Sequence, residues 1–583
     1  MRRFAMTAIV AAFSTGLAVP AGAQLDFRNL DDGRPLWSED AWPVERRAIE
    51  WLLPWSAEWG REGTLHRSRP EIAWGAWDNL MLGAKLPLAF VPGASGRDFG
   101  ITGPGAFLFY NFRGEGPKMP ALALRAEGHL PVGSLAADEG SVTLKGIATR
   151  TIGRERVHVN AAWTPVGARA AGGTHAEPQW AAAVAVDRTL IRTSTLIAAE
   201  LVARDGGEGA SAQFSAAVGL RRQMTPTLVL DLGLSRALER DPGHAWTVTA
   251  GFSTALGIGR APRGVRPARG QTVRAEWHYL PGSFNWQFLQ RYPEAARLFN
   301  AFDYGHAILY EHLWTRPDRA KELLEDGEFN FLTRDLLVRP PRFMVAEDVV
   351  EPAYARVALE AKRMFEWAHL LHRQIYDAYA DERLSRAEQH ALVERLTDDY
   401  LSRDRLAFTD QPKQMTLMDD QPFSQYFRRE FPKMNGLIWA YHWLQVGLYE
   451  PLLEEETPSG KKAGIADALA TFWGMADSPP SRFPAVMPMT SAVAPTFSKA
   501  HPRAAIIFDN LHMMHDIISD ILANPAVPRA AKPNLIREQL AEFRNPDTNL
   551  MGMEHWWMMG EMMGGVEKMG GRAGRTKGTT GMP

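Results

Sequence analysis

The sequence predicts a two-part fold: an antiparallel transmembrane β-barrel of about twelve strands, followed by an all-α, bundle-like domain. Apolar residues alternate with polar or small ones from about residue 48 to 257, which is the period of β-strands. Residues 258–271 are rich in Gly, Pro and Arg, a composition typical of a linker. Beyond them, apolar residues recur three and four positions apart, which predicts helices.

The 583 residues are enough for two to four domains. We expect six parts along the chain: a signal peptide (1–23), an N-terminal segment (24–46), the barrel (47–257), the linker (258–271), the helical domain (272–545) and a Met/Gly-rich tail (546–583). Helices are expected over residues 351–380, 383–402, 436–453, 465–475 and 504–523.

The first residues predict export from the cytoplasm. Arg2 and Arg3 precede an apolar run of signal-peptide length from Phe4 to Val19, and the A-x-A sequence at 21–23 is typical of a cleavage site. The mature chain is therefore expected to begin near Gln24. A short buried helix would also be apolar, but it would not explain the small residues at the cleavage site.

Composition excludes several classes of function. The formal net charge is −2, so the chain lacks the general positive field of nucleic-acid-binding proteins. It contains no cysteine, which excludes disulfides, iron–sulfur clusters and covalently attached c-type haem. Soft metals could then be bound only by Met or His. After the signal peptide, no run of eighteen apolar residues predicts a membrane-spanning helix.

The alternating segments predict one apolar and one polar face. In the segment 122–130, Leu122 and Leu124 alternate with Arg125 and Glu127. A soluble β-sandwich would also alternate, but its core would not tolerate unpaired charges. A barrel with lipid outside and a wet lumen inside accommodates both faces. The predicted lumen-facing residues include Arg125, Glu127, His129, Arg156, His158 and Asp231.

The barrel prediction also uses aromatic residues and strand number. We expect aromatic side chains at the strand ends, where membrane barrels carry interfacial girdles: Trp74, Trp77, Phe107, Phe109, Tyr110, Trp180 and Trp246. With an even number of strands, the chain would enter and leave the barrel on the periplasmic side, and the helical domain would lie there too. An odd number would place that domain outside the cell.

Residues 28–258 resemble a known family. The stretches 30–35, 39–45, 185–190 and 225–231 are similar to outer-membrane transporter-like barrels of the phenol-degradation meta-pathway family. The resemblance implies an outer-membrane location and passage of small molecules, and it supplies no binding residue. Barrels of this kind usually end the chain, whereas here more than three hundred residues follow.

Carboxylate and histidine residues recur at a fixed spacing in the second half. Asp303–His306, Glu366–His369 and Asp509–His512 are three carboxylate-x-x-His units, and residues three apart share one helix face. Such units on paired helices form di-metal sites in helical bundles. The candidate ligands are Asp303, His306, Glu366, His369, His372, His442, Asp509, His512, His515 and Asp516.

Two interpretations of these units stay open. They could be core histidines satisfied by Asp, Glu or backbone groups, or they could bind a transition metal, copper or iron. The ferritin-like pattern is not matched cleanly, because Asp replaces Glu twice and a third unit is present. Iron or manganese oxidase chemistry is therefore only an analogy.

The tail is a second candidate metal site. Thioether and imidazole ligands suit copper, particularly Cu(I), but a Met/Trp stripe could equally be apolar packing. Glycines interrupt the run and favour a non-helical conformation. The candidate copper ligands are Met551, Met553, His555, Met558, Met559, Met562 and Met563.

Three functions remain at this stage. The first is an outer-membrane barrel with a periplasmic helical domain that binds a metal and transports or handles a metal ion or small molecule. The second is a membrane-anchored di-iron or copper oxidoreductase, and the third is a structural or interaction domain on a barrel. The sequence has no nucleotide-binding loop or nucleophile elbow. We expect outer-membrane lipid and a small-molecule or metal substrate as partners, and no nucleic acid. Substrate, enzymatic activity and oligomeric state are not determined by the sequence.

Overall fold

The computed structural model describes residues 27–563 apart from 45–47, 61–62, 78, 91–98, 117, 167–178, 207–210, 226–227, 239–243, 258–286, 342 and 345–346. The predicted signal peptide, the predicted linker and the last twenty residues of the tail lie outside this part of the chain.

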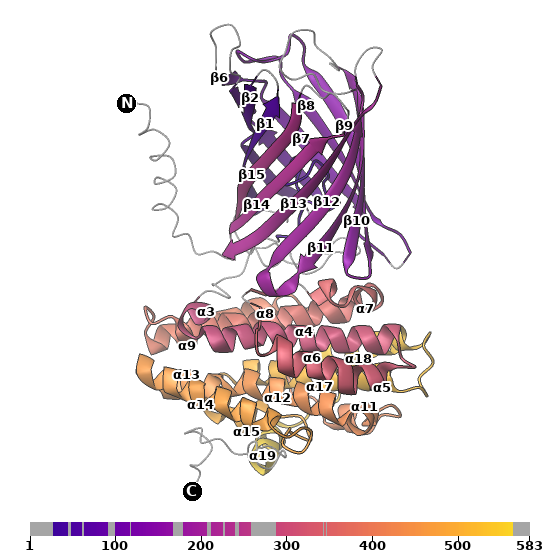
Figure 1. The fold of residues 1–583 in the computed structure, drawn as a ribbon. Coiled ribbons are helices and arrows are strands. Elements are labelled where there is room, and N and C mark those ends of the chain that lie inside the picture. Colours follow the sequence, from indigo (N-terminus) through magenta and orange to yellow (C-terminus); the bar gives the residue numbers. More distant parts are fainter. Residues whose placement is uncertain are drawn as a thin grey trace.

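The first half is a closed antiparallel β-barrel, as the alternation predicted (Figure 1). The chain crosses the barrel wall twelve times, and we call each full crossing a stave. The barrel closes because β1 pairs with β15 from Ala48↔Gly257 to Gly60↔His244. Three staves are each broken into two segments, so that fifteen segments form the sheet. The strands are β1 (Ala48–Gly60), β2 (Gly63–Ser68), β3 (Glu71–Trp77), β4 (Leu80–Lys85), β5 (Leu88–Phe90), β6 (Phe99–Ile101), β7 (Gly105–Arg113), β8 (Ala121–His129), β9 (Ser141–Ile152), β10 (Glu155–Val166), β11 (Trp180–Leu190), β12 (Thr195–Arg204), β13 (Gln213–Thr225), β14 (Leu228–Ala237) and β15 (His244–Gly257).

The two faces of the barrel differ as a membrane barrel requires. Large apolar side chains on the outer face are exposed, including Val184, Leu201 and Leu232. The intervening residues point inward and are buried, including Arg125 and Asp231. An antiparallel sheet with a buried polar face and an exposed apolar face suits lipid outside and a polar interior.

Two aromatic residues point to the opposite face from the one we predicted. Trp74, Trp77, Tyr110, Trp180 and Trp246 are on the outside, but Phe107 and Phe109 are buried inside the barrel. The Phe107 ring lies under the Arg125 guanidinium, 3.6 Å from ring centroid to Cζ. These two phenylalanines alternate with Leu108 and Tyr110, so the strand has apolar residues on both faces and period two could not assign its outer face.

The two ends of the barrel have different connections. At the end where β1 starts and β15 ends, the strands are joined by tight turns such as 153–154 and by the 3₁₀ turn η1 (Ile191–Thr193). The opposite end has longer connections, including 91–98, 130–140 and 167–179. The helical domain lies against the end with the tight turns (Figure 1).

The second half is helical, as predicted, and its long helices lie across the barrel axis (Figure 1). Its elements are α3 (Gln287–Arg291), α4 (Pro293–Thr315), α5 (Ala320–Glu322), η2 (Leu323–Glu328), α6 (Phe329–Phe331), η3 (Leu332–Leu336), η4 (Glu347–Val349), α7 (Pro352–Val357), α8 (Leu359–Ala380), α9 (Arg386–Leu401), α10 (Thr416–Asp419), α11 (Tyr426–Glu430), α12 (Pro432–Gly447), α13 (Tyr449–Glu454), α14 (Pro458–Ala476), α15 (Thr490–Val493), α16 (Pro495–Ala500), α17 (Pro502–Ala523), α18 (Lys532–Arg544) and α19 (Met553–Met563). Among these helices, none is both long and apolar enough to cross a bilayer.

Four of the helices form the centre of this domain. Helices α4, α8, α12 and α17 contribute nearly continuous buried faces. The expected helix over 351–380 is broken at Ala358, whose φ of −123° and ψ of 41° separate α7 from α8. Helix α4, which carries Asp303 and His306, was not among the predicted helices.

The tail was predicted to be non-helical, and this was wrong for residues 553–563, which form α19. Trp556 of this helix is buried, and its indole Nε1 donates a hydrogen bond of 2.8 Å to Asp509 Oδ2. Gly560 allows α19 to approach α15 closely, since a Cβ there would be 2.1 Å from Ser491 Oγ. The glycine serves helix packing here and does not end the helix.

The barrel and the helical domain are in contact at the tight-turn end. Arg356 of α7 forms an ion pair of 3.2 Å with Glu115, in the turn between β7 and β8. Arg192 of η1 pairs with Asp335 of η3. Leu196 and Val229 of the barrel belong to the same cluster of buried apolar residues as the helical core. The two halves therefore share an interface with apolar and charged contacts.

We predict that Trp556→Ala destabilises the helical domain by about 3–5 kcal/mol, because the change removes a fully buried indole and leaves the Oδ2 atom of Asp509 without its donor. The measurement is denaturant unfolding followed by near-UV circular dichroism of the full chain in detergent. The adjacent Trp557, which is only partly buried, is the control, and Trp557→Ala should cost clearly less. Equal effects of the two changes would show that α19 is not docked through Trp556.

Candidate functional site

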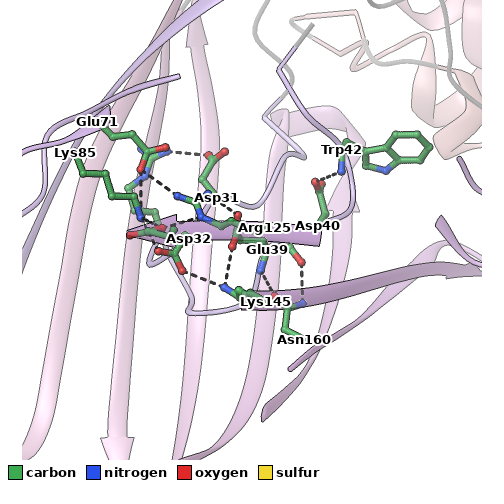
Figure 2. Close-up of polar contacts among 12 residues, drawn as sticks. Asp31, Asp32, Glu39, Asp40, Trp42, Glu71, Lys85, Arg125, Lys145 and Asn160 are labelled. Carbon is green, nitrogen blue, oxygen red and sulfur yellow. Dashed lines mark hydrogen bonds and ion pairs between the residues drawn. The ribbon is translucent and has the colours of Figure 1, made fainter. Parts of the chain in front are cut away.

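Ionisable groups are buried in two places, the barrel lumen and the core of the helical domain. In the lumen they connect the barrel wall to residues 27–44, which run inside the barrel (Figure 2). We call residues 27–44 the plug. Ser38, Glu39 and Asp40 of the plug are each at most 2% exposed.

Ion pairs hold the middle of the plug to one side of the wall. Arg125 Nη1 lies 2.9 Å from Glu39 Oε2, and Lys145 Nζ lies 2.9 Å from Glu39 Oε1. Asp32 accepts from Lys145 at 3.0 Å and from Lys85 at 2.9 Å. Figure 2 shows these acidic plug residues facing basic residues of β4, β8 and β9. The plug neutralises wall charges that would otherwise be buried together.

A second group of contacts holds the rest of the plug. Arg156 bridges Asp40 of the plug at 3.1 Å and Asp187 of β11 at 2.6 Å. His158 also contacts Asp187, at 2.8 Å. From β13, Arg221 pairs with Asp31 of the plug at 2.8 Å. The remaining predicted lumen residues also take part: Asp231 lies 3.5 Å from Arg34, Glu127 is 2.8 Å from Arg125, and His129 is 3.2 Å from Glu127.

Glycines in the wall leave room for the plug backbone. A Cβ at Gly233 of β14 would lie 2.4 Å from the carbonyl oxygen of Pro35, and a Cβ at Gly219 of β13 would lie 2.5 Å from Pro35 Cγ. Glu200 accepts hydrogen bonds from the backbone nitrogens of Trp37 and Ser38 at 2.8 and 2.9 Å. The plug is therefore fitted to the wall by shape as well as by charge.

The plug was not foreseen as a lumen element. Its sequence Leu30-Asp31-Asp32-Gly33-Arg34-Pro35 is dense in charge and turn residues, as surface loops also are. The strand pattern gave no signal for it, because the wall itself carries carboxylates such as Glu127 and Asp187 that pair with Arg125 and Arg156.

Part of the lumen stays open between the plug and the long-loop end. A cavity of about 420 Å³ is lined by charged residues of both signs, including Asp32, Arg67, Glu127, Lys145 and Arg204. The plug separates this vestibule from the helical domain.

The core of the helical domain brings three imidazoles together. His306 of α4, His442 of α12 and His515 of α17 are fully buried, and we call them the histidine site. His306 Nε2 lies 3.0 Å from His442 Nε2, and His515 Nδ1 lies 2.9 Å from the same His442 nitrogen. Two donor atoms each about 2.1 Å from one ion are about 3.0–3.4 Å apart, so these separations suit three ligands of a single metal.

Protonation supports this interpretation of the contacts. His306 Nδ1 donates to the Phe302 carbonyl at 3.0 Å, which leaves the lone pair of Nε2 facing His442. His442 Nε2 carries at most one hydrogen, and it faces two nitrogens. At least one contact therefore brings two lone pairs together or shares one hydrogen. His442 Nδ1 and His515 Nε2 have no hydrogen-bond partner among the residues that the structure describes.

Burial keeps these imidazoles neutral. Desolvation, assisted by the neighbouring His369, lowers the pKa of His306 to about 3. Burial also lowers the pKa values of His442 and His515 well below the ordinary value. Neutral imidazole is the form that binds a metal, so the ligands need not lose protons at neutral pH.

Beside the histidine site lies a second group, Asp303 of α4, Glu347 of η4 and His369 of α8. Glu347 Oε2 accepts from Lys362 at 2.8 Å, and Asp303 Oδ2 accepts from Arg373 at 2.5 Å. Burial acts to raise the pKa of Glu347, but Lys362 and His369 outweigh it and lower the pKa to about 2. Sequence spacing missed Glu347, because it lies in a 3₁₀ turn without a nearby histidine in the chain.

The other predicted ligands have different partners. Glu366 pairs with Lys362 at 2.6 Å, and Asp516 lies 3.5 Å from Arg428. Asp509 accepts from Thr490 and Trp556. His372 Nδ1 is 2.6 Å from the Tyr449 hydroxyl. The ring of His512 stacks on His442 with centroids 4.1 Å apart, outside the convergence of nitrogens.

The tail residues do not converge into one group. Met551 is buried, whereas Met553, Met558 and Met562 of the same segment are exposed. His555 is also exposed, while Met559 packs in part against the helical core. Met563 ends α19.

Comparison with known proteins gives likenesses to barrels. No family model matches the chain, and no curated protein matches it. Among solved structures, it is similar to the KdgM porin (13% identity over 36% of this chain and 98% of the porin, TM-score 0.25). It is also similar to an outer membrane channel from Pseudomonas putida F1 (14%, 39% and 100%, 0.29) and to outer membrane phospholipase A from Escherichia coli (11%, 40% and 98%, 0.24).

We predict that Arg125→Met loosens the plug. The change removes Arg125 from Glu39 and Glu127 and leaves them only Lys145 and Lys85 as cation partners, and breaking buried ion pairs costs up to about 3–5 kcal/mol. The measurement is limited proteolysis of the folded protein with N-terminal sequencing, and the plug should be cleaved much faster in the variant. Arg188→Met removes an exposed ion pair with Glu155 and should leave the cleavage rate unchanged. A plug equally protected in both variants would show that ion pairs do not retain it.

Proposed function

We propose that this protein is an outer-membrane barrel protein whose helical domain, on the periplasmic side, binds a transition metal at His306, His442 and His515 and serves in handling that metal. The observation that carries the proposal is the convergence of three buried imidazoles, in which His306 Nε2 and His515 Nδ1 lie 3.0 and 2.9 Å from His442 Nε2. Three-histidine sites of this kind hold Zn²⁺ or copper.

The outer face of the barrel supports a membrane location. Large apolar side chains are exposed on the outer face of strands all around the barrel. Tryptophans such as Trp55, Trp163 and Trp246 are among them. A soluble protein would expose this much apolar surface at a high cost in free energy. The resemblance of residues 28–258 to the phenol-degradation meta-pathway barrels agrees with this location and is proposed as the family relationship.

The end of the barrel that contacts the helical domain supports a periplasmic placement. Outer-membrane barrels have short turns on the periplasmic side and long loops outside the cell. Here the tight turns 153–154 and 191–194 lie on the side of the helical domain, and the longer connections lie on the other side. Because the number of full-length strands is even, the first strand starts and the last strand ends on that same side.

The plugged lumen favours metal handling over free diffusion through a pore. The plug is held by buried ion pairs to Arg125, Lys145 and Arg156. We therefore assign the barrel the role of a membrane-embedded support that holds the metal-binding domain at the outer membrane. The vestibule lies between the plug and the long-loop end of the barrel.

The membrane location predicts a depth-dependent cost of charge on the outer face. Leu232, in the middle of β14, and Leu238, just beyond its end, are both 54% exposed. Leu232→Arg should destabilise the barrel by about 2–4 kcal/mol in phospholipid vesicles, and Leu238→Arg by about 0–1 kcal/mol. Guanidinium titrations of folding into vesicles measure both. Equal and small costs would argue that water, not lipid, contacts this face.

The metal site predicts that His442→Ala abolishes Zn²⁺ or Cu⁺ binding to the helical domain, because His442 contributes the nitrogen that contacts both others. Full-length protein in detergent is loaded with one metal at a time, desalted and measured by elemental analysis. His312, on the same helix as His306, contacts Glu328 at 2.9 Å outside the site, and His312→Ala should retain the metal. Metal content that is zero in the unaltered protein, or unchanged by His442→Ala, would refute the proposal.

A further inference from the structure

We infer that Asp303, Glu347 and His369 form a second metal site, selective for a harder divalent cation such as Mn²⁺ or Fe²⁺, and that it makes the helical core a two-metal centre. The inference rests on the proposed function for the neighbouring histidine site, which supplies the first metal. The two sites have no ligand in common.

The distances within the second group suit coordination and do not suit hydrogen bonding. His369 Nδ1 lies 3.5 Å from Asp303 Oδ1 and 3.5 Å from Glu347 Oε1. Good hydrogen bonds to these atoms would be about 2.7–3.2 Å long. Two ligands about 2.1 Å from one ion in tetrahedral geometry are about 3.4 Å apart.

Buried polar atoms at this site are left unsatisfied by the protein itself. Within the described part of the chain, Asp303 Oδ1 and both ring nitrogens of His369 have no hydrogen-bond partner. The side chains of Asp303, Glu347 and His369 are only 4%, 6% and 3% exposed. Leaving such groups unpaired is costly, and a bound cation would remove that cost.

Neighbouring cations orient the carboxylates toward a common point. Arg373 binds the Oδ2 atom of Asp303 and Lys362 binds the Oε2 atom of Glu347. The opposite oxygens are thereby turned toward His369. Such outer hydrogen bonds fix the geometry of metal-binding carboxylates in many proteins.

The ligand sets imply different metals in the two sites. Two carboxylates and one imidazole favour Mn²⁺ or Fe²⁺, whereas three imidazoles favour Zn²⁺ or copper. The sites are adjacent, because the His369 ring is 6.0 Å from His306 and 5.6 Å from His515 between centroids. Helix α4 contributes to both, with Asp303 and His306 one turn apart.

The test uses full-length protein in detergent that has first received one equivalent of Zn²⁺, followed by titration with Mn²⁺ monitored by electron paramagnetic resonance. We expect one Mn²⁺ per chain in the unaltered protein. Asp303→Asn and Glu347→Gln should each weaken Mn²⁺ binding at least about 100-fold, since loss of an outer-shell contact alone costs 10–100-fold. Glu328→Gln, which alters the carboxylate that contacts His312 outside both sites, should bind Mn²⁺ normally.

A spectroscopic measurement on the unaltered protein guards against variants that fail to fold. Electron spin echo modulation of the bound Mn²⁺ should show coupling to an imidazole nitrogen, and His369→Gln should remove it. Absence of stoichiometric Mn²⁺, absence of nitrogen coupling, or equal binding by Asp303→Asn and Glu328→Gln would overturn the inference.

The two proposals fail separately. His442→Ala should lose Zn²⁺ and keep Mn²⁺. If His442→Ala loses Zn²⁺ while the unaltered protein never binds Mn²⁺, the histidine site stands and the second site falls. If Mn²⁺ binds through Asp303 while neither Zn²⁺ nor Cu⁺ binds, the histidine site is refuted, and the two-metal centre is refuted with it.

Discussion

Pairing between β1 and β15 is the constraint on which the rest of the structure depends. It closes twelve staves into a barrel and brings Ala48 and Gly257 together at one end. The plug precedes β1 and the helical domain follows β15, so the chain enters and leaves the barrel wall at the same, tight-turn end. Without closure, the wall would not enclose the plug, and Arg125 and Arg156 would lack their carboxylate partners.

Both halves of the molecule bury ionisable groups, but with different consequences. In the lumen, acidic plug residues meet basic wall residues, and the charges compensate one another through short ion pairs. In the helical core, the histidines meet each other, and neutral rings contact through nitrogens. Compensation of the first kind holds a plug in place. The second arrangement lacks internal compensation, and this is why we assign metal binding to it.

Particular residues show how far sequence reasoning extends. Alternation along 122–130 predicted that Arg125 and Glu127 share the inner face, because a strand offers only two faces. The same rule failed for Phe107 and Phe109, since both faces of β7 are apolar. Carboxylate-x-x-His spacing drew attention to His306 and His369, but it grouped Glu366 and Asp509 with them, and these contact Lys362, Thr490 and Trp556. The spacing of residues along the chain shows which of them share a helix face, but it does not show which residues that face contacts.

The sequence by itself determined the two-part architecture, the barrel class and the helices that carry His369, His442 and His515, because strand and helix periods are local properties of the chain. Only the tertiary structure decided that residues 27–44 fill the lumen, that α19 docks through Trp556, and that Glu347 joins Asp303 and His369. These contacts join residues far apart in the chain, and their partners are selected by charge compensation and packing in three dimensions. No spacing along the chain encodes that selection.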